Sequence, residues 1–284
     1  MKNAVSFLSN KYSSMLESKG GYTLNNCFFG YSYYFNMDIF IKIYNNYNRY
    51  FIEKTILLNS NDSKMLDYLQ INKFYAIVFK YEDYTDLSTL DKVVSYKSGK
   101  LLAKYHQENF NLVSKIKNIR NEDNLFSNIK EYLEKLNSLP NYLLLKKIDK
   151  QLFFEHDKVI KEYKLTKTVV LHGDFGLRNL KILNSKLVLI DFESSRTGIK
   201  YRDIIKYFAI DCDSEVLQKA FIDGYNEISS LEKISPLLLN VLKFYTALEI
   251  YNFTLRVNNL EFKEVALKLV TSVKEYLDNN FLNK

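Results

Sequence analysis

The hydrophobic pattern of this chain changes near residue 85, and this change restricts the possible folds. Before it, CFFGYSYYF (27–35) and DIFIKIY (38–44) are rich in aromatic and β-branched residues and flank a short polar break. This pattern predicts two antiparallel strands joined by a tight turn. RYFIEKTILLNS (49–60) has helical periodicity, and INKFYAIVFKYE (71–82) predicts one or two further strands.

Helical periodicity dominates the rest of the chain. It predicts helices over seven segments: 88–107, 122–138, 141–165, 201–210, 213–228, 236–258 and 261–282. The segment 236–258 is apolar on nearly all sides, which predicts a buried central helix, and Pro236 suits its first turn. Three short strands interrupt this half, with Asn184 and Ser185 as a turn between the last two: 167–172, 179–183 and 186–192.

These segments predict an α+β chain in two parts. Residues 1–84 would form a small β-rich part with one helix, and residues 85–284 a larger helical part with an inserted hairpin. A length of 284 residues suits either one large domain or two parts sharing an interface. Hydrophobic residues make up 47% of the chain and charged residues 26%, which excludes a disordered protein.

Cysteine and charge content exclude several classes of protein. Cys27 and Cys212 lack CxxC spacing, so neither a disulfide framework nor a thiolate metal site is expected. No signal peptide and no bilayer-spanning run is predicted, so we expect a location in a reducing cytoplasm and no membrane partner. The net charge is +7, but no basic arm, aromatic-basic motif or zinc finger occurs, so no nucleic-acid partner is expected.

The stretch VLHGDFGLRNLKILNSKLVLIDFE (170–193) places polar side chains at strand ends. Asp174 follows the first strand, Asn179 lies five residues later, and Asp191 ends the next strand pair. Carboxylate and amide oxygens suit Mg²⁺, and a remaining carboxylate could accept a proton from a hydroxyl. Each residue alone is also explained by the turn preference of Asp and Asn. Their combination and spacing favour a catalytic set.

A cation for nucleotide phosphates is the remaining part that phosphoryl transfer requires. Lys42 lies in the middle of the predicted strand IFIKIY, where an unpaired charge would be costly. Glu53, on the following helix, is a suitable partner. The alternatives are a lysine that extends from an edge strand into solvent and a glutamate on a solvated helix face.

Several of these segments resemble the aminoglycoside phosphotransferase family, small-molecule kinases with a protein-kinase-like fold. HGDFGLRN resembles the family's HGDxxxxN loop, and IDFE resembles its counterpart of the kinase DFG segment. GKLLAKYHQ (99–107) and YRDIIKYF (201–208) resemble two of its helices. The likeness covers most of the chain in order and is strongest between 99 and 208. It implies an α+β, bilobal protein-kinase-like fold with a nucleotide-binding N-lobe and an acceptor-binding C-lobe.

The resemblance implies roles by position. Asp174 would orient or deprotonate the substrate hydroxyl, and Asn179 and Asp191 would bind Mg²⁺. Lys42, held by Glu53, would contact the nucleotide phosphates. His172 and Asp203 would support the catalytic loop. The phosphate donor implied is ATP or GTP, and the choice between them stays open.

The nucleotide-covering loop departs from the family pattern. It has a single glycine, Gly30, in FFGYSYYF and no GxGxxG. Ser32 is the residue that the resemblance assigns to phosphate contact. The hinge beside the purine is expected between Phe79 and Asp83, with Tyr81 in its middle.

The spacing after Asp191 favours a small acceptor. Only eleven residues separate Asp191 from Asp203, and no APE-like motif follows, so no peptide-docking segment is expected. Residues 203–284 carry 12 acidic and 9 basic side chains, whereas the rest of the chain carries 21 and 31. This acidic half predicts the acceptor site. The candidate acceptor-binding carboxylates are Asp211, Glu215 and Glu249.

Several functions remain open. The first is a phosphotransferase acting on a hydroxyl of an aminoglycoside or another antibiotic. A kinase of choline, a sugar or homoserine is the alternative, and a non-catalytic nucleotide-binding relative is a third class. A metal-dependent phosphatase would need more metal-binding side chains than three histidines readily supply. The oligomeric state, monomer or dimer, is not predicted.

Overall fold

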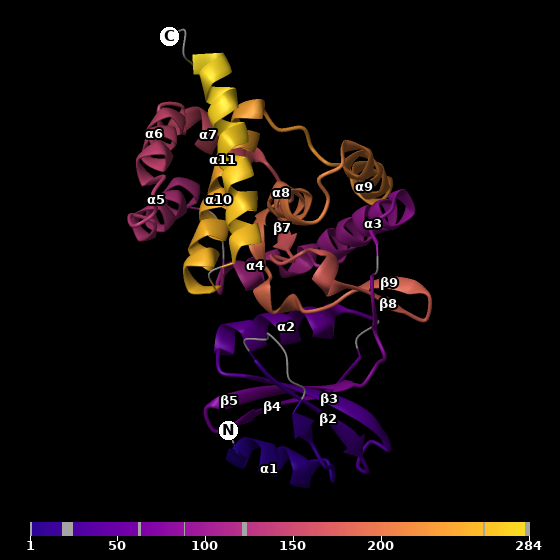
Figure 1. Cartoon of the computed structure of the whole chain (residues 1–284). Coiled ribbons are helices and arrows are strands. Elements are labelled where there is room, and N and C mark those ends of the chain that lie inside the picture. The colour runs from indigo at the N-terminus through magenta and orange to yellow at the C-terminus, as the bar shows by residue number, and fades with distance from the viewer. Residues whose placement is uncertain are drawn as a thin grey trace. The chain divides into compact units, whose positions relative to one another are not determined.

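A computed structural model of the chain describes residues 2–18, 25–61, 64–87, 89–120, 124–257 and 259–281. It divides into two compact units: Met1–Asp86 with Lys181–Ser195, and Leu87–Leu180 with Arg196–Lys284 (Figure 1). The fold is mixed α and β, with an antiparallel sheet in the N-terminal region and helices in the C-terminal part, as predicted. The assignment of the two parts to nucleotide and acceptor binding stays a prediction.

The first unit holds most of the strands. Its elements are α1 (Lys2–Lys11), β1 (Glu17–Ser18), β2 (Asn26–Ser32), β3 (Met37–Tyr44), α2 (Tyr47–Asn59), β4 (Met65–Ile71), β5 (Phe74–Lys80), β6 (Thr85–Asp86), β8 (Leu180–Leu183), β9 (Lys186–Leu189) and the short 3-10 helix η3 (Phe192–Ser194). The prediction gave all of 85–284 to the second part. Residues 181–195 belong to the first unit instead, where β8 pairs antiparallel with β6 through Thr85 with Ile182 and Asp86 with Lys181.

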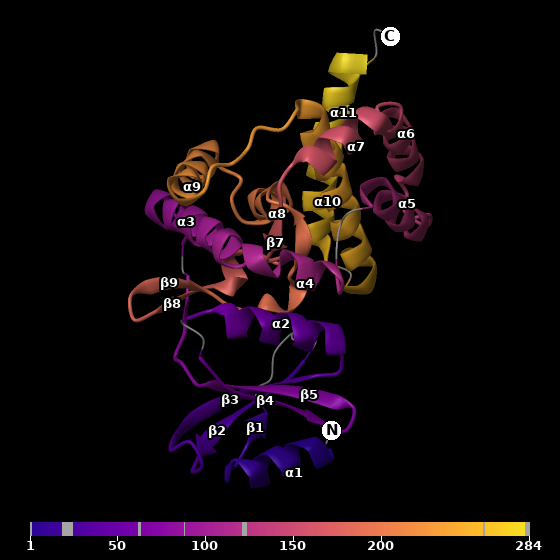
Figure 2. The same ribbon diagram turned by 180° about the vertical axis from the view of Figure 1, so that it is seen from behind.

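The main sheet is antiparallel in the order β1-β2-β3-β5-β4, and α1 and α2 cover opposite faces of it (Figures 1 and 2). Side chains alternate between the faces of a strand. Ile39, Ile41 and Ile43 pack in the cluster that includes α1, whereas Tyr44 packs in the cluster that includes α2. The same alternation directs Lys42 towards α2.

The second unit is mostly helical. Its elements are α3 (Lys92–Glu108), η1 (Phe110–Leu112), α4 (Val113–Lys117), α5 (Leu125–Lys135), α6 (Tyr142–Phe153), α7 (His156–Leu165), β7 (Thr168–Leu171), η2 (Leu177–Asn179), β10 (Arg196–Ile199), α8 (Tyr201–Ile210), α9 (Glu215–Ile228), α10 (Pro236–Val257) and α11 (Leu260–Phe281). Helix α10 is buried on most sides within the largest apolar cluster, which confirms the predicted central helix. Among the described residues, no helix combines the length and apolar character that crossing a bilayer requires.

Helices α3 and α9 lie side by side and meet at two glycines (Figure 2). A Cβ atom at Gly99 would lie 2.0 Å from the carbonyl oxygen of Phe221, and one at Gly224 would lie 2.0 Å from that of Tyr96. Both distances are far below any normal carbon–oxygen contact. The two backbones are therefore packed directly against each other, and neither position has room for a side chain.

Several elements differ from the prediction. The helix expected over 141–165 is two helices, α6 and α7, because apolar positions stay in helical register across the break and the pattern cannot reveal it. Helix α1 was not predicted, so the β-rich part has two helices and not one. Helix α4 was also missed, as were strands β1, β4, β6 and β10. The helix ends predicted at 88, 122, 258 and 282 lie outside the described residues.

Candidate functional site

Lys42 lies at the centre of a group of carboxylates in the first unit. Its Nζ is 2.9 Å from Glu53 Oε2, 2.5 Å from Asp191 Oδ1 and 2.9 Å from Glu193 Oε2. Burial would lower the pKa of Lys42, but the three carboxylates raise it well above its usual range. The lysine is therefore charged, and the structure brings it together with its predicted partner Glu53 and with Asp191, which was predicted as a Mg²⁺ ligand.

Glu53 is fully enclosed beside this lysine. Its Oε2 accepts hydrogen bonds from Lys42 and, at 2.7 Å, from the hydroxyl of Tyr44. Burial raises the pKa of Glu53 to about 6, although the Lys42 ammonium pulls it in the opposite direction. Strand β3 supplies both donors, and α2 supplies the carboxylate. Side-chain alternation on β3 explains this arrangement, since residues 42 and 44 share one face.

Asp191 adopts an unusual backbone conformation. Its φ is 66°, in the left-handed region that few residues other than glycine occupy. Such a conformation is typical of functional positions. Strand β9 ends at Leu189, three residues before the predicted strand end at 192. The Asp191 side chain is 38% exposed, so it keeps access to solvent while one oxygen contacts Lys42.

Glu193 is a site residue that the sequence interpretation missed. Its carboxylate contacts Lys42, accepts a hydrogen bond from Asn25 and pairs with Arg49 Nη1 at 3.0 Å. The signal was present, because Glu193 lies only two residues after Asp191 in IDFE. Its burial beside two cations gives it a direct electrostatic influence on Lys42.

These carboxylates are also the candidate metal ligands of the first unit. One oxygen each of Glu53, Asp191 and Glu193 lies within 4.8 Å of the others. Hard oxygen donors of this kind fit Mg²⁺. Lys42 Nζ already lies among them, however, so an ion held by all three would have to displace it. The more exposed Asp191 fits a magnesium ligand best, because it could bind an ion without displacing Lys42.

Gly30 and Ser32 contact the backbone of residues 12–15, which precede the main sheet strands. A Cβ at Gly30 would lie 2.1 Å from the carbonyl oxygen of Met15, so close backbone packing explains this glycine. Ser32 is buried, and its hydroxyl donates to the carbonyl of Tyr12 at 2.7 Å and accepts from the amide of Phe35 at 3.2 Å. These contacts explain both residues without a nucleotide, and their predicted phosphate roles remain untested.

The predicted hinge lies at the end of β5. Phe79 is in the strand and packs near Phe40, with ring centroids 6.0 Å apart. The amide of Tyr81 donates to the carbonyl of Asp38 at 2.9 Å, which continues the sheet beyond the strand. Asp83 follows on the exposed surface. Contact of these residues with a purine stays a prediction.

The predicted catalytic loop of the second unit, in HGDFGLRN (172–179), is held in place by Asp203. This buried carboxylate accepts hydrogen bonds from the amides of His172 at 2.7 Å and Gly173 at 2.9 Å. Gly173 has a φ of 77°, so the turn requires glycine there. His172 is also buried, and its Nδ1 accepts from the amide of Asp174 at 3.3 Å. His172 and Asp203 thus lie together around the loop.

Asp174 lies between two cations. Oδ1 is 3.1 Å from Lys206 Nζ, while Oδ2 pairs with Arg178 and accepts from Asn179 Nδ2 at 3.1 Å. Burial would raise the pKa of Asp174, but Lys206 and Arg178 outweigh it and hold the pKa below its usual value. The carboxylate is therefore ionised at neutral pH. Sequence reasoning missed Lys206 and Arg178.

His106 supports the same loop from α3. Its Nε2 lies 3.2 Å from Asp203 Oδ2, and its Nδ1 lies 2.7 Å from the hydroxyl of Tyr225 on α9. His106 is buried and bonded at both nitrogens, so it does more than fill space on α3. Burial of Asp203 would raise its pKa, but hydrogen bonding and charge from His106 lower it below the usual value.

The three acceptor candidates have different surroundings. Asp211 accepts from the amide of Leu177 at 3.2 Å, and a Cβ at Gly176 would lie 2.7 Å from its Oδ2, so it packs against the catalytic loop. Burial raises the pKa of Asp211. Glu215 is exposed in the first turn of α9. Their predicted contact with an acceptor is untested.

Glu249 forms ion pairs with two arginines. It lies 3.0 Å from Arg196 Nη2 and 2.8 Å from Arg202 Nη2. Burial would raise the pKa of Glu249, but the two guanidinium groups outweigh it and lower the pKa to about 2. These contacts favour a structural role over the predicted acceptor role.

We expect Glu249→Gln to lower the free energy of unfolding by about 2 kcal/mol at pH 7, because two arginines lose their partner. The folded pKa lies below the unfolded value, so this stabilisation is present above about pH 4.5 and declines towards pH 2. Urea unfolding of both proteins at pH 7 and pH 3 checks it. The exposed Glu264→Gln is the control, and an equal loss there would contradict the argument.

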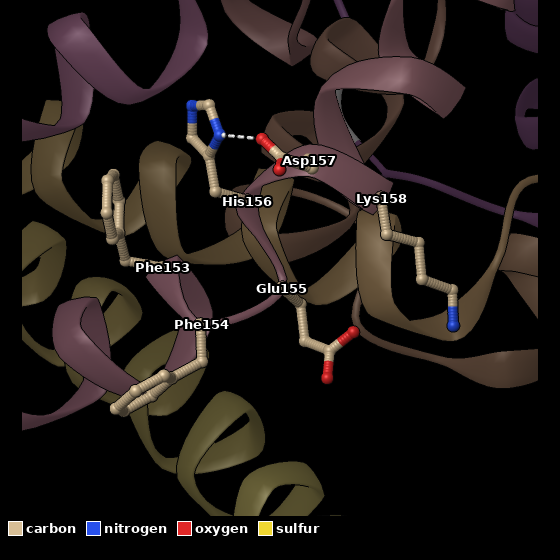
Figure 3. Close-up of a pocket in the computed structure, with 6 residues that line it drawn as sticks. All are labelled: Phe153, Phe154, Glu155, His156, Asp157 and Lys158. Atoms are coloured by element: carbon tan, nitrogen blue, oxygen red, sulfur yellow. Dashed lines mark hydrogen bonds and ion pairs between the residues drawn. The ribbon is translucent and has the colours of Figure 1, made fainter.

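A hollow of about 510 Å³ lies where α6 meets α7 (Figure 3). It is lined by the consecutive residues 153–158, with the rings of Phe153 and Phe154 and an exposed pair in which His156 Nδ1 lies 3.0 Å from Asp157 Oδ1. One continuous exposed segment forms it, and none of the predicted site residues lines it. We therefore do not regard it as the functional site.

Comparison with known proteins identifies the family of the chain. The family model described as "Phosphotransferase enzyme family" matches residues 61–237. No curated protein sequence gives a match. A solved structure of a thermostable mutant of the aminoglycoside phosphotransferase APH(4)-Ia, with AMP-PNP and hygromycin B, has a TM-score of 0.66 and 10% identity, covering 96% of this chain and 98% of that chain.

Two further structures are similar over nearly their whole length. A choline kinase from Streptococcus pneumoniae has a TM-score of 0.62 and 16% identity, covering 98% of this chain and 99% of its own. Spectinomycin phosphotransferase, solved with ADP and spectinomycin, has a TM-score of 0.58 and 15% identity, covering 96% and 93%. At such identities the likeness shows the protein-kinase-like fold. The family match extends over more than half of the sequence, and the chain therefore belongs to the phosphotransferase enzyme family.

Proposed function

We propose that this phosphotransferase moves the γ-phosphate of ATP or GTP to a hydroxyl group of a small molecule. The observation that carries the proposal is the buried Lys42, held by Glu53 and Asp191 in the first unit. Burying a charged lysine among carboxylates has a desolvation cost and adds little stability, so a functional role explains it better. Nucleotide phosphates are the anions that this lysine would bind. Similar structures solved with ADP or AMP-PNP support a nucleotide donor.

Asp191 and Asn179 are the residues we propose as Mg²⁺ ligands. When bound, Mg²⁺ would neutralise charge that develops on the transferred phosphate. Both side chains offer the oxygen that this ion prefers. Asn179 Nδ2 donates to the carbonyl of Asp174 at 2.8 Å, so its amide oxygen points away from that bond and is the atom left for an ion.

Asp174 is the proposed catalytic residue. Its ionised carboxylate would accept the proton of the acceptor hydroxyl as the hydroxyl oxygen bonds to the γ-phosphorus. The bond between that phosphorus and the bridging oxygen breaks at the same step, and the nucleoside diphosphate leaves with the electron pair. His172 and Asp203 would act by holding the loop that presents Asp174.

The leading acceptor class is an aminoglycoside or another antibiotic, supported by the neighbours that bind hygromycin B and spectinomycin. A metabolite kinase is the second candidate, since the choline kinase is similar over a larger share of both chains. Glu249 is paired with two arginines, which removes one carboxylate from those available to a cationic acceptor.

Nucleotide consumption tests the proposal. The protein is incubated with Mg²⁺ and either ATP or GTP, together with hygromycin B, spectinomycin, choline or a sugar. We expect diphosphate release that depends on one acceptor class, with a mass gain of one phosphate on that compound. If nucleotide binds but no compound accelerates its consumption, a non-catalytic role replaces this proposal.

We expect Lys42→Met to lower kcat/KM for the nucleotide about 10²-fold, because it removes the cation that faces the phosphates. The change also leaves buried carboxylates unpaired, so we pair it with the double variant Lys42→Met with Glu53→Gln, which removes part of their charge. Circular dichroism monitors folding of both. Lys73→Met, at an exposed turn, is the matched control. Unchanged turnover in the folded double variant would exclude a phosphate role for Lys42.

A further inference from the structure

Helix α8 contacts the catalytic loop through two side chains one turn apart. Asp203 accepts from the amides of His172 and Gly173. Three residues later, Lys206 Nζ lies 3.4 Å from the carbonyl oxygen of Gly173 and 3.1 Å from Asp174 Oδ1. Side chains three residues apart share one face of a helix. Helix α8 thus offers a carboxylate to the loop amides and an ammonium to the loop carbonyl and the Asp174 carboxylate.

Of the two cations that contact Asp174, Lys206 is less exposed to solvent than Arg178. The Lys206 side chain is 21% exposed and that of Asp174 is 16% exposed, whereas the side chain of Arg178 is 65% exposed. A half-buried ion pair is less screened by water and salt than an exposed one. Arg178 can therefore leave Oδ2 at little cost, while Lys206 stays on Oδ1.

A second carboxylate restricts Lys206 further. Its positive charge also interacts with Glu249 on α10. Glu249 is itself fixed by Arg196 and Arg202, at 3.0 and 2.8 Å. The lysine therefore lies in the field of two carboxylates, one in the catalytic loop and one anchored in the helical core. Its orientation follows from the packing of α8 and α10.

This inference rests on the proposed phosphoryl transfer. We infer that Lys206 is a positioning residue, whose ammonium fixes Oδ1 of Asp174 and so directs Oδ2 to the acceptor hydroxyl. The hydroxyl takes the place of the exposed Arg178 guanidinium, and Asn179 Nδ2 keeps its contact with Oδ2. The proton moves to Oδ2 as the new oxygen–phosphorus bond forms and the bridging bond breaks. Fixing one oxygen in this way supplies the orientation that phosphoryl transfer requires.

The test compares Lys206→Ala and Lys206→Arg with the parent protein, using Mg·ATP with hygromycin B, spectinomycin, choline or water alone as acceptors. We expect Lys206→Ala to lower kcat about 10- to 100-fold, because a misplaced carboxylate loses its alignment. KM for ATP should stay within about twofold, since nucleotide binding does not involve Lys206. Lys206→Arg should recover most of the rate. Added ethylammonium should raise the rate of Lys206→Ala and not that of Asp174→Asn.

Lys219→Ala, on the exposed face of α9, is the matched control and should behave as the parent. A kcat within threefold of the parent in folded Lys206→Ala would overturn the inference while the proposed function stands. Loss of activity that neither arginine nor ethylammonium restores would overturn it too, since that would indicate a purely structural role. A parent protein that consumes no ATP with any of these acceptors would overturn the proposed function, and the inference with it.

Discussion

Asp174→Asn is expected to lower acceptor-dependent turnover about 10³-fold, because the amide cannot accept the proton of the attacking hydroxyl. Nucleotide binding should change little, since Asp174 is proposed to act on the acceptor and not on the nucleotide. Lys206 and Arg178 lose an ionised partner, but both reach solvent, so the protein should stay folded. Initial rates of diphosphate release, with nucleotide affinity from calorimetry, measure the two effects separately.

Asp157→Asn is the control for this change. Asp157 is fully exposed, lines the hollow of Figure 3 and lies outside the predicted catalytic loop. The same chemical change there should leave turnover at the parent value. If Asp174→Asn retained the parent rate while Asp157→Asn did not, the hollow and not the HGD loop would be the place to search for the chemistry.

Asp203→Asn is expected to lower the free energy of unfolding by about 3 kcal/mol and to abolish turnover together with it. Three donors converge on the buried carboxylate: the amides of His172 and Gly173, and His106 Nε2 at 3.2 Å. An asparagine offers one acceptor oxygen and turns a second donor towards them. At least one buried N–H group would then lose its partner.

Chemical denaturation measures this loss, and the exposed Asp223→Asn on α9 is the matched control. We expect the control to change the free energy of unfolding by no more than about 0.5 kcal/mol. A stable Asp203→Asn protein with normal activity would show that the loop does not depend on this carboxylate. The pH dependence has the same origin: since His106 and the loop amides lower the pKa of Asp203, its stabilising effect declines as the pH falls below the ordinary range of an aspartate.

Local motifs were readable from the sequence because they depend on short spacing. The HGD loop and IDFE each lie at the end of a short strand, and the apolar pattern located both strands. Lys42 and Glu53 could be paired in advance, because strand alternation and the following helix leave few other partners. For these residues, local sequence and tertiary structure point to the same arrangement.

Contacts made across distant segments could not be read in the same way. Lys206 meets Asp174 only because α8 packs against the loop, although its position three residues after Asp203 was a usable signal. Glu249 looked available for an acceptor, since its helix is apolar, yet Arg196 and Arg202 come from other elements to pair with it. Sequence periodicity reports that a residue is buried and not which partner it has.

Gly30 illustrates a third limit. A lone glycine in a predicted phosphate loop invites a functional explanation. The close approach of the Met15 backbone also requires glycine at this position. Residues 12–16 lie between α1 and β1, and no periodic pattern in the sequence places them beside β2. Steric reasons for glycine become visible only when the neighbouring chain is known.

The glycine contact between α3 and α9 couples the packing of these two helices to the catalytic loop. Tyr225 follows Gly224 directly, and its hydroxyl holds His106, which in turn contacts Asp203. The separation of the two helices therefore sets the reach of this chain of hydrogen bonds into the catalytic loop. A methyl group added at Gly99 would force the two helices apart and so weaken the contact of His106 with Asp203, although neither of these residues changes. Descendants of this sequence could diversify their acceptor-binding surfaces widely, but we expect selection to hold these two glycines constant.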